Sequence, residues 1–279
     1  MKTILVPTDF SKPAKNAVDY AARLAKDLET SVLLFHTYHL PVTATEVPLM
    51  ISSEELQRDN ELALSKEANE LSKKWGIEVN YKTRMGLASD EILDEAKNAG
   101  LIVMGMNGAG KVTRAVMGSI AVSMVRKSTI PVLVIPEEAT YKKPDKIVFA
   151  CDYDPKVDIQ TLNVLKKIAE TFQSTLYIVN VKDKKEVVTQ EEKAIAVSID
   201  KKLCDVQHVF YFPEKTDLVT GLDEFVNLKH ADMLAIIPHR YNMMERLFHK
   251  SISKKMAYHT KIPLLALPDN HESVAAYFF

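Results

Sequence analysis

Short apolar runs alternate along the chain with longer segments in which apolar residues recur at helical spacing. Residues 3–7 (TILVP) and 31–37 (SVLLFHT) are almost entirely apolar or β-branched, which predicts two strands that are buried on both faces. Between them, Ser11 and Pro13 precede a run of regularly spaced alanines, which predicts a helix capped by Ser11. Strands that alternate with helices in this way pair in parallel through crossover helices.

The same alternation continues through the first half of the chain. It predicts a helix over 53–75, a strand over 77–84, a helix that begins at Ser89, a strand over 101–105 (LIVMG), a helix that begins near Gly118 and a strand over 130–136 (IPVLVIP). In sheets of this kind, ligands bind beyond the carboxyl ends of the strands. The residues that directly follow each strand are therefore the first candidates for a functional site.

Four strand-like segments of the first half recur in the same order in the second half. The pairs are KTILVPTD and KIVFACD, TSVLLFHTY and STLYIVNV, LIVMG and LAIIP, and IPVLVIP and IPLLALP. Because buried strands resemble one another, a single match carries little weight, but four in order indicate a tandem duplication. We predict two α/β domains, 1–138 and 144–279, each a doubly wound, mostly parallel five-stranded sheet with helices on both faces, joined by a charged linker.

Composition narrows the class of protein. The chain has 279 residues, of which 47% are hydrophobic and 26% are charged, values that are typical of soluble globular proteins. The 36 basic and 37 acidic residues leave a net charge of -1, which argues against a general electrostatic grip on nucleic acid or on an anionic membrane. There is no disulfide framework, no signal-peptide pattern and no apolar run long enough to cross a bilayer, so we expect a cytoplasmic protein.

The glycines are unevenly distributed. Of the eight glycines in the chain, four lie in one window after the strand over 101–105, namely Gly105, Gly108, Gly110 and Gly118. Such a loop turns sharply and brings backbone N–H groups close to an anion, and the helix that begins near Ser119 adds unpaired N–H donors. Lys111 and Arg114 would add positive charge. The alternative interpretation is a flexible surface loop whose glycines only make turns.

Other kinds of site are less well supported. The window nearly matches a phosphate-binding P-loop, but Val112 stands where that motif needs the Ser or Thr that binds Mg²⁺. The eight histidines do not have metal-binding spacing, and the nucleophile motif Gly-x-Ser-x-Gly is absent. We therefore predict neither catalytic nor metal-binding residues.

Taken together, these features resemble the universal stress protein family. The shared pieces are VPTDFS near the start, the loop pattern Gly-x-x-Gly, nine residues, then Gly-Ser, and the strand PVLVIP. In the ATP-binding branch of the family the loop has this same pattern, so the first half matches it in full. The resemblance covers the whole chain as two fused family domains, and it implies the adenine-nucleotide alpha-hydrolase-like fold.

The resemblance also implies a site for ATP, ADP or AMP, with or without Mg²⁺, in the first domain. Asp9 would read the adenosine portion, the backbone of Thr37 would contact adenine, and the glycine loop would hold the phosphates. Asp9 has an alternative role as a cap for the helix that follows it. The implied binding residues are Pro7, Thr8, Asp9, Thr37, Met104, Gly105, Asn107, Gly108, Gly118, Ser119 and Ile120.

The second half departs from this pattern. Arg240 and Lys250 replace two of the loop glycines, and Pro238 lacks a backbone N–H, so we expect no nucleotide to bind there in the same way. The resemblance implies that the strands over 130–136 and 262–268 pair, which would make the chain an internal pseudo-dimer. Whether two chains form a homodimer stays open.

The favoured function is nucleotide-dependent signalling in a stress response. A bound nucleotide would shift the glycine loop between two states, and an unidentified protein partner would read the difference. Because no base stands out that could activate water on a phosphate, we expect at most slow ATP hydrolysis. Two alternatives remain, namely an ATPase or phosphoryl-transfer enzyme that uses Lys111, Arg114 and Asp9, and a scaffold with a vestigial site.

Overall fold

Ten strands form one continuous sheet in this computed structural model, which describes residues 2–39, 53–106, 119–151, 153, 159–180, 189–211, 218–238 and 262–268. The strands of the first half are β1 (Ile4–Pro7), β2 (Val32–Tyr38), β3 (Val79–Met85), β4 (Leu101–Met106) and β5 (Val132–Pro136). Those of the second half are β6 (Lys146–Cys151), β7 (Thr175–Asn180), β8 (His208–Tyr211), β9 (Met233–Ile236) and β10 (Leu264–Ala266). The order across the sheet is β3-β2-β1-β4-β5-β10-β9-β6-β7-β8.

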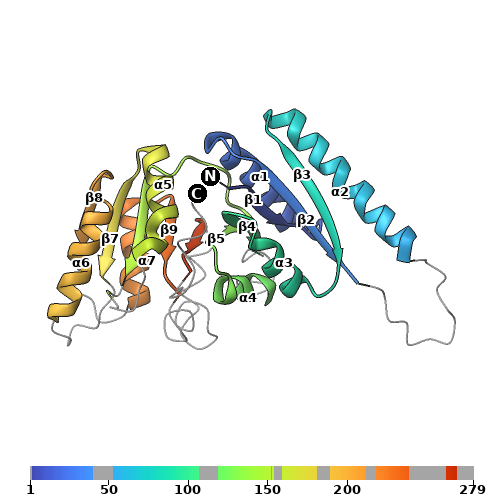
Figure 1. Cartoon of the computed structure of the whole chain (residues 1–279). Helices are drawn as coiled ribbons and strands as arrows, with labels where there is room; N and C mark the ends of the chain where they lie inside the picture. Colours follow the sequence, from blue (N-terminus) through green and yellow to red (C-terminus); the bar gives the residue numbers. More distant parts are fainter. Residues whose placement is uncertain are drawn as a thin grey trace.

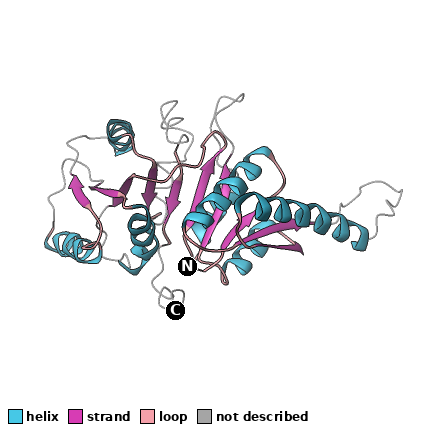
Figure 2. Ribbon diagram, turned by 90° about the horizontal axis from the view of Figure 1, so that it is seen from above, coloured by secondary structure: helices cyan, strands magenta, loops and turns pink. Residues whose placement is uncertain are grey.

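Helices cover both faces of this sheet (Figure 1, Figure 2). In the first half they are α1 (Lys12–Asp27), α2 (Ser53–Trp75), α3 (Ala88–Ala96) and α4 (Ser119–Lys127). In the second half they are the 3-10 helix η1 (Ile159–Leu162), α5 (Asn163–Phe172), α6 (Gln190–Lys202) and α7 (Leu218–Lys229). The buried side chains of α1, α2, α5 and α6 pack on one face, and those of α3, α4 and α7 pack on the other.

The predicted α/β fold with mostly parallel strands is confirmed. Each half has its first strand flanked by its second and fourth strands, so the strand order reverses beside β1 and beside β6. The predicted helix over 53–75 has the expected bounds, while the strand expected over 77–84 begins two residues later, at Val79. The helix expected from Ser89 begins one residue earlier, at Ala88, a difference that is normal at helix ends.

The two halves join edge to edge through β5 and β10, which run antiparallel. Leu265 faces Leu133 at the centre of this joint, and both side chains are fully buried. The expected pairing of the two terminal strands is confirmed, and it turns two five-stranded units into one sheet. Each strand covers the backbone edge that the other would otherwise expose.

The linker between the halves, residues 137–146, is held at both ends by side chains. The Tyr141 hydroxyl donates to the carboxylate of Asp27 in α1, and burial together with this bond raises the pKa of that hydroxyl. Toward the second half, Asp232 accepts hydrogen bonds from the backbone nitrogens of Asp145 and Lys146, and each bond is 3.0 Å long. Asp232 also forms an ion pair with Lys142, in which the nitrogen and oxygen atoms are 2.7 Å apart. The charged segment is therefore fixed to both halves.

A glycine lets the first turn of α1 pack directly against β4. A Cβ atom added at Gly105 would lie 2.3 Å from the carbonyl oxygen of Pro13 and 3.0 Å from the backbone nitrogen of Ala14. The backbone of a helix turn cannot move aside as the end of a flexible side chain can. Gly105 therefore sets how closely the N-terminus of α1 approaches the carboxyl end of β4.

Among the described helices, none is both long enough and apolar enough to cross a membrane.

We predict that Leu265→Ala will destabilise the joint between the halves. The substitution leaves a cavity in a fully buried strand, which costs about 2–5 kcal/mol of the free energy of unfolding. Urea denaturation followed by circular dichroism measures this change. The control is Leu228→Ala on α7, where the leucine is 70% exposed, and an equal loss in the two variants would contradict the assigned joint.

We also predict that Gly105→Ala will lower stability, because its new methyl group overlaps the backbone of Pro13. Overpacking of this kind costs about 1–3 kcal/mol, which thermal unfolding will detect as a lower Tm. Gly100→Ala serves as the control, since its nearest contact would be 3.1 Å away, in Lys2 near the N-terminus. If Gly105→Ala were no less stable than the control, the close contact with α1 would be wrong.

Candidate functional site

A cavity of about 220 Å³ lies at the carboxyl ends of β1, β2 and β4. This is the place where the strand order of the first half reverses, and ligands of doubly wound sheets bind at such a point. Eight of the predicted site residues line the cavity, namely Pro7, Thr8, Asp9, Thr37, Met104, Gly105, Ser119 and Ile120. The other three predicted residues, Asn107, Gly108 and Gly118, lie outside the described residues.

The cavity also has walls that the sequence analysis did not assign to the site. Ser11, Pro13 and Ala14 come from the start of α1, and Ala88 and Ile92 come from α3. Phe35 of β2 and Ala121 of α4 complete the apolar part. Ser11 and Pro13 could have been predicted as wall residues from the sequence, because a helix cap that directly follows a strand must lie at the carboxyl edge of the sheet. Nothing in the spacing of α3 distinguished its cavity face from an ordinary core face.

A tight turn between β1 and α1 positions the carboxylate of Asp9. Asp9 Oδ1 accepts a hydrogen bond of 3.0 Å from the backbone N–H of Ser11, and Thr8 Oγ1 accepts one of 3.1 Å from the backbone N–H of Phe10. Phe10 has a left-handed backbone with φ of 63°, and its ring packs on the ring of His36. His36 Nδ1 donates a hydrogen bond of 2.8 Å to the carbonyl oxygen of Thr8. The turn is thus fixed from both sides.

The alternative role of Asp9 as the helix cap is resolved by this geometry. Ser11 is the N-cap of α1, and its side chain accepts the backbone N–H of Ala14 over 3.4 Å. Asp9 stabilises the preceding turn with one oxygen only. Its side chain is exposed, and Oδ2 makes no hydrogen bond to any other described residue. That oxygen is available to accept a hydrogen bond from a ligand.

Three helices begin at the cavity. The first residues of α3 and α4, Ala88 and Ser119, line it, as do the cap and first turn of α1. Each helix N-terminus carries unpaired N–H groups and a partial positive charge, so their convergence favours a negatively charged group. Asp9 is the one ionisable side chain among the described lining residues. Within the described part of the chain, no cluster of His, Cys, Asp or Glu is arranged to hold a metal ion.

The second half repeats the turn after its first strand. The backbone N–H of Tyr153 donates to Cys151 Sγ over 3.4 Å, and Tyr153 has a left-handed φ of 55°. The equivalent of Gly105 is Ile237, whose side chain is buried in the core. Among the described residues of the second half, the first α-helix, α5, begins at Asn163, directly after η1. A bulky side chain at Ile237 is incompatible with the close approach that α1 makes to β4.

The comparisons with known proteins agree with this fold. Residues 1–136 match the universal stress protein family. Universal stress protein MJ0531 of Methanocaldococcus jannaschii is 30% identical over 150 residues, which cover 52% of this chain and 84% of that protein. A universal stress protein of Synechocystis is 34% identical over 139 residues, which cover 48% of this chain and 85% of that protein.

A solved structure resembles this fold over most of the chain. The crystal structure of a universal stress protein from Archaeoglobus fulgidus superposes with a TM-score of 0.75 at 16% identity, and the alignment covers 96% of this chain and 98% of that chain. At this identity the likeness shows the fold alone, but it extends through both halves. The family match over residues 1–136 and the 30% identity to a relative that is covered over 84% of its length give the assignment: the chain belongs to the universal stress protein family.

Proposed function

We propose that the first half of the chain binds an adenine nucleotide in the cavity beside β1, β2 and β4. The observation that supports this most directly is that three helix N-termini and the Asp9 carboxylate surround one apolar cavity. The apolar part suits a flat base, the carboxylate suits a sugar hydroxyl, and the helix N-termini suit phosphate. A nucleotide carries these three chemical parts in one molecule.

The size of the cavity indicates how the ligand would be divided. Whole small-molecule sites usually have volumes of about 300–1,000 Å³, and this cavity measures about 220 Å³. We therefore place the base and the sugar in the described cavity, with the base against Phe35, Ile92 and Met104. The phosphates would extend past Ser119 toward residues 107–118, where the family loop pattern lies, and a bound Mg²⁺ would accompany them.

The two halves would have different roles. We propose the domain division at 1–138 and 144–279, with the nucleotide site in the first domain only. Ile237, buried where the first half has Gly105, supports this division of roles, because it removes the space that the first turn of α1 occupies. The second domain would then serve as a fixed partner that completes the sheet through β10.

The biological role that follows is signalling by binding. Residues 107–118 connect β4 to α4, so a bound nucleotide would shift the populations of their conformations, and a protein partner would read the shift as part of a stress response. Fast hydrolysis is not expected, because Asp9, the sole ionisable group among the described lining residues, is placed at the sugar and not at the phosphates.

Calorimetry with ATP and with adenosine tests the proposal. We predict one ATP bound per chain, and we predict that Gly118→Val weakens ATP more than adenosine because a side chain there blocks the close approach of phosphate. No heat at millimolar ATP would instead support a scaffold with a vestigial site. Phosphate release at about 1–10³ s⁻¹, the usual range of enzymes, would support catalysis.

Asp9→Asn separates ligand binding from local structure. The asparagine oxygen can still accept the N–H of Ser11, so the turn and the Tm should be retained. The amide that replaces Oδ2 cannot accept a sugar hydroxyl, so affinity for ATP should fall about 10- to 100-fold, the usual worth of a hydrogen bond to a charged group. Unchanged affinity together with an unchanged Tm would show that Asp9 serves the turn alone.

A further inference from the structure

We propose that Arg84 is a positioning residue for the nucleotide site, because it fixes α3, which forms one wall of the cavity, against the edge strand β3. The inference rests on the proposed function, and it adds to the site a residue that does not itself line the cavity. Arg84 contacts three carboxylates of α3, and two other α3 residues, Ala88 and Ile92, face the cavity.

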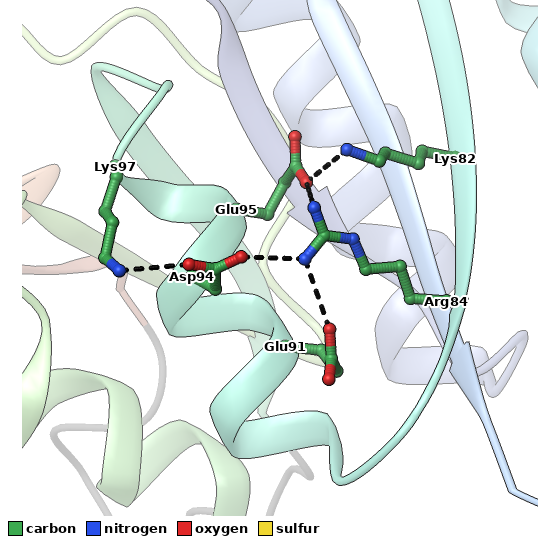
Figure 3. A network of polar contacts seen from close by, with 6 residues as sticks. All are labelled: Lys82, Arg84, Glu91, Asp94, Glu95 and Lys97. Carbon is green, nitrogen blue, oxygen red and sulfur yellow. Dashed lines mark hydrogen bonds and ion pairs between the residues drawn. The ribbon is translucent and has the colours of Figure 1, made fainter.

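The ion pairs between β3 and α3 form one connected cluster (Figure 3). Arg84 Nη1 lies 2.8 Å from Asp94 Oδ2 and 3.3 Å from Glu91 Oε2, and Nη2 lies 3.1 Å from Glu95 Oε2. Lys82 Nζ approaches the same oxygen of Glu95 to 2.6 Å. The guanidinium thereby spans about one turn of the helix. It also holds the pKa of the Asp94 carboxyl below its ordinary value.

This cluster differs from ordinary surface ion pairs in that one of its carboxylates, Glu95, is buried. The side chain of Glu95 is only 6% exposed, and Arg84 is 31% exposed. Exposed pairs contribute little, whereas weakening the pairing of a buried carboxylate is costly. Loss of Arg84 would leave Lys82 as the remaining charged partner of Glu95 among the described residues, and it would release Glu91 and Asp94 from β3. The position of α3 against β3 would then be held less firmly.

The other contacts that fix α3 in the described structure are apolar. The helix has nine residues, and its N-cap Leu87 makes no side-chain capping bond. A helix of this length is marginal on its own, so its place depends on tertiary contacts. The apolar anchors are Ile92 and Ala96, which pack into the core. Since Ile92 is both an anchor and a wall of the cavity, any displacement of α3 changes the cavity directly.

Two further contacts connect Arg84 with the site. Arg84 pairs in the β-sheet with Thr37, which is one of the residues that line the cavity. Between β3 and α3, Gly86 makes room for Glu91, because a Cβ atom at Gly86 would lie 2.5 Å from Glu91 Oε1. The turn that leads into α3 is thus shaped so that Glu91 can reach back to Arg84.

The α3 wall belongs to the apolar part of the cavity, where we place the base and the sugar. Its displacement should therefore weaken adenosine, AMP and ATP by the same factor. A change at the phosphate end would instead weaken ATP more than adenosine.

The experiment compares Arg84→Met with the control Lys74→Met, which removes the ion pair between α2 and Asp19 away from the cavity. We predict that Arg84→Met lowers the affinity for all three ligands about tenfold, a typical effect of losing a supporting residue, whereas the control has no effect. Hydrogen exchange of the α3 amides without ligand should become faster in Arg84→Met only. Arg84→Lys, which keeps the charge without the planar fork, should restore part of the affinity.

The outcomes separate the two proposals. If the wild-type chain binds none of the three ligands, the proposed function fails and this inference fails with it. If the wild type binds and Arg84→Met lowers the Tm but leaves all three affinities unchanged, Arg84 serves stability alone and only this inference is overturned.

Should Arg84→Met not fold, Asp94→Asn removes one ion pair of the cluster at an exposed position. The expected result is a loss of affinity of about threefold that is the same for adenosine, AMP and ATP. No loss in that variant would also overturn the inference.

Discussion

The close contact between Gly105 and the first turn of α1 is the constraint on which the candidate site depends. Because no side chain intervenes, the start of the helix lies directly against the carboxyl end of β4. Ser11, Pro13 and Ala14 consequently become a wall of the cavity rather than part of a distant surface. The turn that contains Asp9 must lie at the same edge, since it is the connection between β1 and this helix.

The second half shows what happens when this constraint is relaxed. The turn after the first strand is retained, with Cys151 and Tyr153 in the places of Thr8 and Phe10. The glycine is not retained, and the buried side chain of Ile237 occupies its position. Among the described residues, the first α-helix of this half begins at Asn163, after η1. The first half forms the cavity described above, and the second half contributes β10 to the shared sheet.

The elements of the fold follow from local patterns, but their joints do not. Apolar runs and the spacing of alanines predicted the strands and α1 because burial on a given face imposes that periodicity. The linker illustrates the opposite case. Its charge and lack of apolar periodicity predicted a simple connection, yet Tyr141 and Lys142 bind Asp27 and Asp232 from opposite sides. These partners are far apart in the sequence, so no local pattern encodes the contact.

The fold class, the internal repeat and the strand ends beside the site could be predicted from the sequence, because periodicity and turn-forming residues are local properties. Three features became visible only in the folded chain: α3 supplies Ala88 and Ile92 to the cavity, Asp9 keeps one oxygen available, and Arg84 contacts α3. Each of these depends on how separate elements pack. Packing is a cooperative property of the folded chain, and the composition of one segment does not reveal which neighbour it will meet.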